Sequence, residues 1–188
     1  MREVIAHLKS ISPYSQSRHY SKDEVPPLSK ERADDYEKRT WRNRMHVSAE
    51  GFVFIPPMAF KNCIAEIAKY NGEQIPGKGK STYTKHFESG VMVIDPLELP
   101  FKADQIAGEW LFVPGDGKRG SGKRVMKCFP LIPEWHGHVR FHILDDTITE
   151  EVFERHLEQA GKFIGVGRFR PRNNGYYGRF AIEKLEWI

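Results

Sequence analysis

Positive charge gathers in three segments of this 188-residue sequence that contain no acidic residue. They span residues 77–87, 117–127 and 161–180, and each is rich in glycine or in other turn-forming residues. The first and the third also contain tyrosine. A flexible backbone with concentrated cations and aromatic rings suits binding to a phosphate backbone whose bases are unstacked. Each segment alone also fits an ordinary solvated loop, but three in one chain favour a polyanionic partner.

The third of these segments has the most specific chemistry. Gly165 and Gly167 allow a tight turn and a close approach of the backbone to a ligand. Arg168, Arg170 and Arg172 alternate, so in an extended chain they would project to one side, where guanidinium groups pair with phosphate and stack on bases. A tyrosine pair that follows supplies a stacking ring. The alternative is a β-hairpin with solvated arginines, but no acid lies close in sequence to neutralise them.

Two nucleotide-binding motifs fail in this sequence. Residues 72–78 match the start of a Walker loop, but Gly79 stands where a serine or threonine must bind the metal. Gly165 and Gly167 lack the third glycine of a dinucleotide fingerprint, because Arg170 occupies that position. We therefore predict no cofactor.

The histidines indicate no metal site. His136, His138 and His142 lie before or within a strand-like stretch, and no cysteine that would complete a zinc site is close in sequence. We predict no metal and interpret these three as exposed strand histidines. His19 and His46 lie near tyrosines and arginines, so either has the chemistry of a general base for RNA cleavage without a metal.

The composition limits the class of protein. Hydrophobic residues make up 39% and charged residues 29%, with a formal net charge of +4, which is typical of a globular chain. The apolar runs are short compared with the roughly 20 residues of a membrane span, so we expect no membrane partner. Two widely separated cysteines predict reduced thiols and a cytoplasmic location. The length fits one domain over residues 1–188, with loop insertions near 12–50, 73–90 and 115–128.

Hydrophobic periodicity along the chain predicts alternating strands and helices. Strands are expected over residues 3–11, 52–55, 91–99, 110–114, 139–143 and from 180 onward. One helix follows Pro56 and Pro57, carries a single apolar stripe and stops at Gly72. A second begins at a capping box that opens with Thr147. This order predicts an α+β, ferredoxin-like or RRM-type antiparallel sheet with two packed helices and extended loop insertions.

Two segments resemble the RAMP superfamily, the RRM-like RNA-binding subunits of CRISPR effector complexes. Residues 54–69, FIPPMAFKNCIAEIAK, resemble the family's strand-to-helix segment I-P-x-S-S-L-K-G-A-L-R, with Lys61 at the helix lysine and Met58 and Ala59 in place of the serine pair. Residues 165–180, GVGRFRPRNNGYYGRF, are similar to its carboxy-terminal glycine-rich loop and final strand. The resemblance is closest to the backbone-subunit type and implies single-stranded RNA, further copies of the chain or other CRISPR-type subunits as partners.

We therefore predict a non-catalytic protein that binds single-stranded nucleic acid, RNA or DNA with RNA preferred, through basic glycine-rich loops. The predicted nucleic-acid-binding residues are Lys61, Lys78, Lys80, Lys85, Lys118, Arg119, Lys123, Arg124, Gly165, Gly167, Arg168, Arg170, Arg172, Tyr176 and Arg179. Two alternatives stay open. One is a metal-independent endoribonuclease of the CRISPR RNA-processing type that uses His46 or His19, and the other is a mobile-element protein that joins or interferes with a CRISPR complex.

Overall fold

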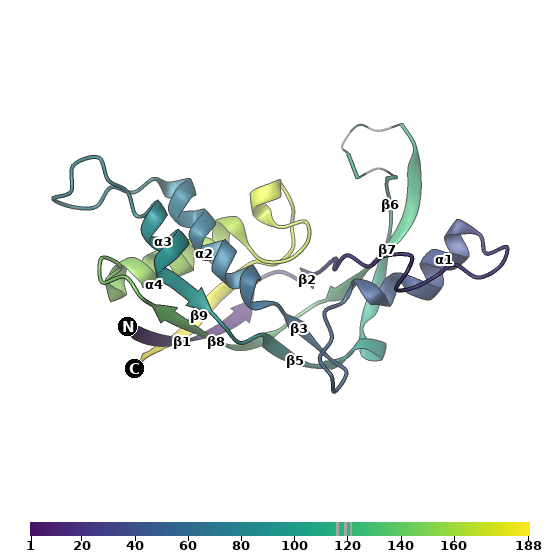
Figure 1. Cartoon of the computed structure of the whole chain (residues 1–188), viewed down its shortest axis with the longest axis horizontal. Coiled ribbons are helices and arrows are strands. Elements are labelled where there is room, and N and C mark those ends of the chain that lie inside the picture. The colour runs from purple at the N-terminus through teal and green to yellow at the C-terminus, as the bar shows by residue number, and fades with distance from the viewer. Residues whose placement is uncertain (116, 119, 121) are drawn as a thin grey trace.

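The largest sheet is antiparallel and has four strands in the order β4-β8-β1-β9 (Figure 1). The computed structural model describes residues 1–115, 117–118, 120 and 122–188. The strands of this sheet are β1 (Arg2–Ser10), β4 (Val91–Val93), β8 (His136–Ile143) and β9 (Phe180–Trp187). β1 lies between β8 and β9, so the first and last strands of the chain pair directly.

Two smaller sheets extend from this central layer. One has the order β2-β7-β6, and in the other β3 pairs with β5. Their strands are β2 (Tyr14–Ser15), β3 (Phe52–Ile55), β5 (Leu97–Lys102), β6 (Ala107–Pro114) and β7 (Arg124–Ile132). β6 and β7 form a hairpin that projects away from the central sheet in Figure 1, on the same side as the first helix.

Four α-helices and four shorter helical turns complete the described part of the chain. The α-helices are α1 (Ala33–Thr40), α2 (Pro57–Asn71), α3 (Thr84–Gly90) and α4 (Glu150–Gln159). The short turns are η1 (Trp41–Arg44), η2 (Ala103–Gln105), the π-helical η3 (Ala160–Ile164) and η4 (Pro171–Asn173). In Figure 1, α2, α3 and α4 lie together along one side of the four-stranded sheet.

The core lies between this sheet and the helices. Val4, Ala6 and Leu8 alternate along β1 and are fully buried, as period-two patterning requires of a strand with one covered face. On α2 the predicted stripe of Phe60, Cys63, Ile64, Ile67 and Ala68 is buried, and Gly72 ends the helix in the left-handed conformation at φ 57°. The α+β, RRM-type architecture is confirmed, with α1 and α3 added to the two packed helices that we expected.

The start of α4 differs from the sequence prediction. The N-cap is Thr149, whose hydroxyl accepts a hydrogen bond from the Val152 N–H at 3.3 Å. Thr147 instead donates its backbone N–H to the Asp145 carboxylate at 2.8 Å. Thr147 was the expected N-cap because Glu150 stands three residues after it. In the structure the backbone N–H of Thr147 belongs to the turn at Asp145, and Thr149 therefore caps the helix.

Candidate nucleic-acid interface

The glycine-rich loop over residues 165–179 is fixed to the segment that follows β1. The Arg168 N–H donates to the Ser15 carbonyl at 2.7 Å, and the Gly178 N–H donates to the Pro13 carbonyl at 2.8 Å. Within the loop, the Val166 N–H donates to the Gly178 carbonyl at 3.0 Å. These bonds give the loop a defined shape, which a binding surface needs if it is to hold a ligand without first being ordered.

Gly167 has the backbone geometry that the sequence suggested. Its φ is +83°, and a Cβ there would overlap the Ser15 carbonyl oxygen and the Tyr14 ring. Tyr14 is fully buried, so the ring has no room to move away. The loop therefore approaches β2 as closely as it does because this position lacks a side chain.

The three loop arginines do not project to one side. Phe169 has φ +51° and residues 171–173 form η4, so the chain here is not extended. Arg168 lies over the Phe129 ring of β7, with its guanidinium carbon 3.5 Å from the ring centroid. Arg170 and Arg172 instead pair with Glu66 of α2 at 2.9 and 3.1 Å.

A cavity of about 400 Å³ lies beside the loop, and we call it the glycine-loop pocket. It is lined by Tyr14, Gln16, Ser17, His46, Pro56, Ala59, Asn62, Val166, Gly167, Arg168 and Arg170. The pocket brings together the glycine-rich loop, the amino-terminal end of α2 and the segment after β2. Burial, with the nearby positive charge of Arg18, lowers the pKa of His46, so its ring is neutral at pH 7.

A second cavity of about 340 Å³, the tyrosine pocket, shares Ser17 with the first. Its lining residues are Ser17, Arg18, His19, Tyr20, Lys22, Tyr36, Arg44 and Lys127. Its two tyrosines provide stacking surfaces. Three of its cations already have acidic partners, since Arg18 pairs with Glu24, and Arg44 and Lys127 pair with Glu37.

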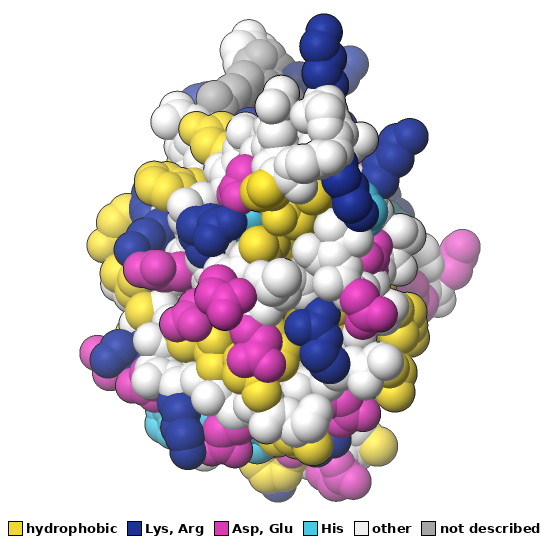
Figure 2. All heavy atoms as spheres, turned by 90° about the vertical axis from the view of Figure 1, so that its left-hand side faces the viewer, with side chains coloured by type: hydrophobic (Ala, Val, Ile, Leu, Met, Phe, Trp, Pro, Cys, Tyr) yellow, Lys and Arg dark blue, Asp and Glu magenta, His cyan; other side chains and the backbone are white. Residues whose placement is uncertain are grey.

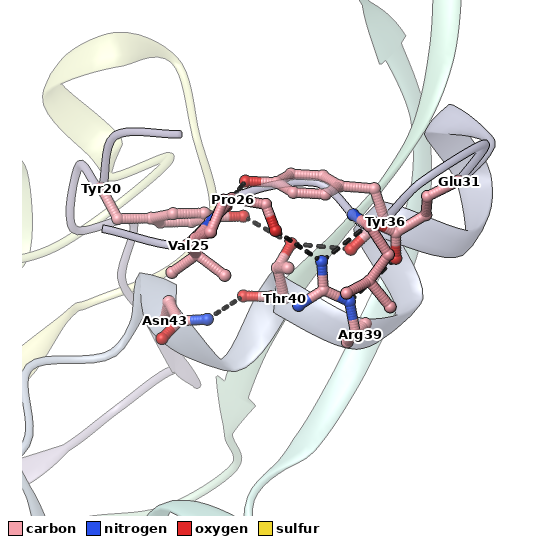
Figure 3. A network of polar contacts seen from close by, with 9 residues as sticks. Tyr20, Val25, Pro26, Glu31, Tyr36, Arg39, Thr40 and Asn43 are labelled. Atoms are coloured by element: carbon pink, nitrogen blue, oxygen red, sulfur yellow. Dashed lines mark hydrogen bonds and ion pairs between the residues drawn. The ribbon is translucent and has the colours of Figure 1, made fainter. Parts of the chain in front are cut away.

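Hydrogen bonds to α1 hold the tyrosines of this pocket in place (Figure 3). The Tyr20 and Thr40 hydroxyls lie 3.0 Å apart, and the Tyr36 hydroxyl donates to the Val25 carbonyl at 2.8 Å. Arg39 connects the same loop to the helix through Glu31, with Nε–Oε1 at 2.8 Å. The loop that carries Tyr20 is thus tied to a helix rather than left without tertiary contacts.

Phe129 lies between one arginine from the lining of each pocket, although it lines neither pocket itself. Arg44 lies 5.2 Å from the Phe129 centroid and 5.5 Å from that of Tyr20, and Arg168 lies over Phe129 from the glycine-loop side. Phe129 and Gln16 are not among the residues predicted from the sequence. The sequence does contain a signal for Phe129. It stands two residues after Lys127, and residues two apart on a strand lie on the same face.

Arg44 and Lys127 are held by one buried acid. Glu37 of α1 is 1% exposed, and its carboxylate lies 2.8 Å from Arg44 Nη1 and 2.9 Å from Lys127 Nζ. It also accepts the Cys128 N–H at 2.9 Å. Glu37 therefore joins α1 to β7 underneath the tyrosine pocket.

The other predicted binding residues lie away from these two pockets. Lys61 donates to the Glu88 carbonyl at 2.6 Å, Lys78 to the Thr147 hydroxyl at 3.5 Å, and Arg179 to the Lys162 carbonyl at 3.2 Å. Lys80, Lys85, Lys123, Arg124 and Tyr176 are exposed, and so is Lys118, whereas Arg119 lies outside the described residues. The site residues as a set stay a prediction.

The three basic segments occupy different positions along the long axis of the molecule. In Figure 1 the segment at 77–87 is at one end, the glycine-rich loop is in the middle, and the β6–β7 hairpin is towards the other end. Figure 2 views the first of these ends and shows acidic and basic side chains interspersed. This end of the molecule is therefore not a continuous basic surface.

Three histidines and two cysteines were the residues weighed as metal ligands from the sequence. His136, His138 and His142 lie on β8, and both cysteines are buried and unpaired with each other. The described residues contain no group of three histidine, cysteine or acidic side chains placed to hold a metal. In the same part of the chain, no helix has the length and apolar character to cross a membrane.

No family model matches the sequence, and no curated protein matches it in sequence. Among solved structures, a chain of the type III-B Cmr-beta complex bound to cognate target RNA matches with a TM-score of 0.55 and 10% identity, covering 100% of this chain and 60% of that chain. Cmr6 from Pyrococcus furiosus matches with a TM-score of 0.49 and 15% identity, covering 96% and 97%. A chain of a CRISPR RNA-guided surveillance complex matches with a TM-score of 0.41 and 9% identity, covering 98% of this chain and 67% of that chain. The expected resemblance to RAMP subunits is thus confirmed at the level of the fold.

Proposed function

We propose that this chain is a RAMP-type subunit that binds single-stranded RNA without cleaving it. The observation that carries the proposal is the pair of neighbouring pockets that share Ser17, with Phe129 in contact with one arginine from the lining of each, Arg44 and Arg168. Guanidinium and aromatic faces at successive points along a groove are what unstacked bases and their phosphates need. The fold shared with a chain of an RNA-bound complex supports this choice of ligand.

The three arginines Arg168, Arg170 and Arg172 of the loop have different roles in this proposal. Arg168 faces the groove, whereas Arg170 and Arg172 share Glu66 and are largely neutralised by it.

The protein works with further subunits of a CRISPR-type assembly or copies of itself, in the cytoplasm, where Cys63 and Cys128 remain reduced. A mobile-element protein that joins such an assembly would use the same groove.

RNA binding is expected to weaken steeply with salt, because cations in the groove displace counterions from the RNA. With two to four phosphate contacts the affinity for a short unstructured RNA should fall by roughly 5- to 50-fold between about 50 and 200 mM salt. Fluorescence anisotropy at several salt concentrations measures this slope. Arg168→Ala should reduce both the affinity and the slope, whereas Arg140→Ala, on the far face of the sheet and paired with Glu3 at 3.0 Å, should change neither. A flat salt response, or equal losses in the two variants, would contradict the proposal.

A metal-independent endoribonuclease is the second candidate, and the position of His46 favours it. His46 is neutral at pH 7 and lines the glycine-loop pocket with Arg168, so it has the protonation state of a general base for a 2′-hydroxyl. Cleavage also needs a proton for the leaving oxygen. Tyr14 also lines the pocket, but burial raises its pKa and makes its hydroxyl a weaker acid than usual, so it is a poor source of that proton.

We therefore expect labelled RNA to remain intact when incubated with the protein in EDTA. His46→Ala and His19→Ala should behave alike, since His19 is exposed in the neighbouring pocket and serves as the matched control. Gel electrophoresis of the RNA gives the readout. Specific cleavage that disappears in either variant would establish the nuclease instead, with the sensitive histidine as its general base.

A further inference from the structure

Phe169, in the glycine-rich loop, has a backbone conformation that a phenylalanine rarely adopts. Its φ is +51°, in the left-handed region, where a bulky residue is strained because its Cβ crowds the following carbonyl oxygen. The same loop has glycine at the left-handed positions Gly165, Gly167 and Gly178, where this strain does not arise. The turn at residue 169 therefore needs a left-handed conformation, but it does not need an aromatic ring.

The Phe169 ring does not offset this strain by filling the core. Phe169 is 46% exposed, and its ring meets that of Tyr177 edge to face with the centroids 6.2 Å apart. Tyr176 is 59% exposed and meets Tyr177 in the same manner at 5.8 Å. We call these three residues the aromatic cluster. Backbone strain is concentrated at functional positions in proteins, and neighbouring exposed apolar side chains mark binding surfaces.

Tyr177 holds the aromatic cluster in place. Its hydroxyl donates to the Glu109 carboxylate of β6 at 2.7 Å, and its backbone N–H donates to the Phe169 carbonyl at 3.1 Å. Burial and the Glu109 carboxylate raise the pKa of Tyr177 to about 12, so the hydroxyl keeps its proton and this bond at neutral pH. The rings are thus positioned before a ligand arrives, which reduces the entropy lost on binding.

The aromatic cluster continues a series of alternating arginines and rings. The Arg168 guanidinium carbon lies 3.5 Å from the Phe129 centroid and 6.0 Å from that of Phe169. From Phe129 the series runs in the other direction through Arg44 to Tyr20 in the tyrosine pocket. Cations interleaved with aromatic faces are the combination that binds single strands, and the exposed rings of the cluster stand at one end of this series.

We propose that the aromatic cluster is a stacking platform that receives one unstacked base of the bound strand on Phe169 or Tyr176. Every base has a π face, so the platform adds affinity without selecting a sequence. The need for a ring at the surface explains why a phenylalanine stands at a left-handed position that glycine would occupy without strain. This inference rests on the proposed RNA-binding function.

The test compares a short unstructured RNA with an abasic strand of the same length, which keeps the riboses and phosphates but carries no bases. Phe169→Gly relieves the backbone strain and removes the ring. By fluorescence anisotropy it should lower the affinity for the RNA by roughly 5- to 100-fold. Its affinity for the abasic strand should equal that of the wild type, because no cation is lost.

Asn174→Gly is the matched control. Asn174 is exposed in the same loop at φ +58°, so the substitution relieves a similar backbone conformation without removing a ring. It should change the affinity for neither strand.

The possible outcomes separate this inference from the function on which it rests. If Phe169→Gly binds the RNA as tightly as the wild type, or loses equally on both strands, the stacking platform is overturned and RNA binding stays intact. Failure of the wild-type protein to bind RNA overturns both. Thermal melting shows whether Phe169→Gly is folded. If it is not, Tyr176→Leu decides, because it keeps apolar bulk and removes the other exposed ring: a loss confined to the RNA supports the platform, and unchanged RNA affinity overturns it.

Discussion

Replacing Glu37 by alanine is expected to lower the free energy of unfolding by about 3–5 kcal/mol. The carboxylate is buried and serves Arg44, Lys127 and the Cys128 N–H at once, with distances of 2.8–2.9 Å. Without it, two cations are left facing each other under the tyrosine pocket, and a buried N–H loses its acceptor. Chemical denaturation of the purified protein measures the loss.

The control for this substitution lies on the same helix. Asp35→Ala removes an exposed carboxylate that pairs with Lys38 at 3.7 Å, so it should cost less than about 1 kcal/mol. Glu37→Gln separates the two roles of Glu37, since the amide can still accept the Cys128 N–H but no longer neutralises the cations. We expect Glu37→Gln to lie closer to Glu37→Ala than to wild type. Equal stabilities of Glu37→Ala and Asp35→Ala would show that the buried acid contributes nothing special.

Contacts between residues close in sequence account for most of what could be predicted. The stripe on α2 and its end at Gly72 depend on residues within one or two turns of each other, and both are confirmed. The two helices α2 and α4 and the strands next to them are confirmed for the same reason. The single strand expected over residues 91–99 is instead two strands, β4 and β5, in different sheets, and β7 was not predicted. The positive φ at Gly167 is likewise a local property that a glycine between two bulky residues indicates.

Contacts between distant segments explain what the sequence could not show. Arg170 has no acid near it in sequence, yet Glu66, more than one hundred positions earlier, pairs with it in the fold. Phe129 receives Arg168 from a loop nearly forty positions later. Gln16 belongs to a polar stretch with no motif, and only the docking of the glycine-rich loop encloses it. The site is thus formed by tertiary packing, and its local pattern identified the loop but not the groove.

The glycine-rich loop offers the second large effect. Gly167→Ala should destabilise the protein by about 3 kcal/mol or more, because positive φ costs about 1–2 kcal/mol for an L-residue and the added methyl overlaps the Ser15 carbonyl and the buried Tyr14 ring. The loop must then move away from β2. Arg168 would lose its position over Phe129, and RNA affinity should fall together with stability.

Gly51→Ala separates backbone strain from the close approach. Gly51 has φ +88°, nearly the same as Gly167, but a Cβ there would meet nothing within 4 Å. It should therefore cost only about 1–2 kcal/mol and leave RNA binding unchanged. Thermal melts and RNA titrations on both variants provide the comparison. If Gly167→Ala loses no more stability than Gly51→Ala and binds RNA equally well, the loop does not depend on its contact with β2, and Arg168 is not held over Phe129 by it.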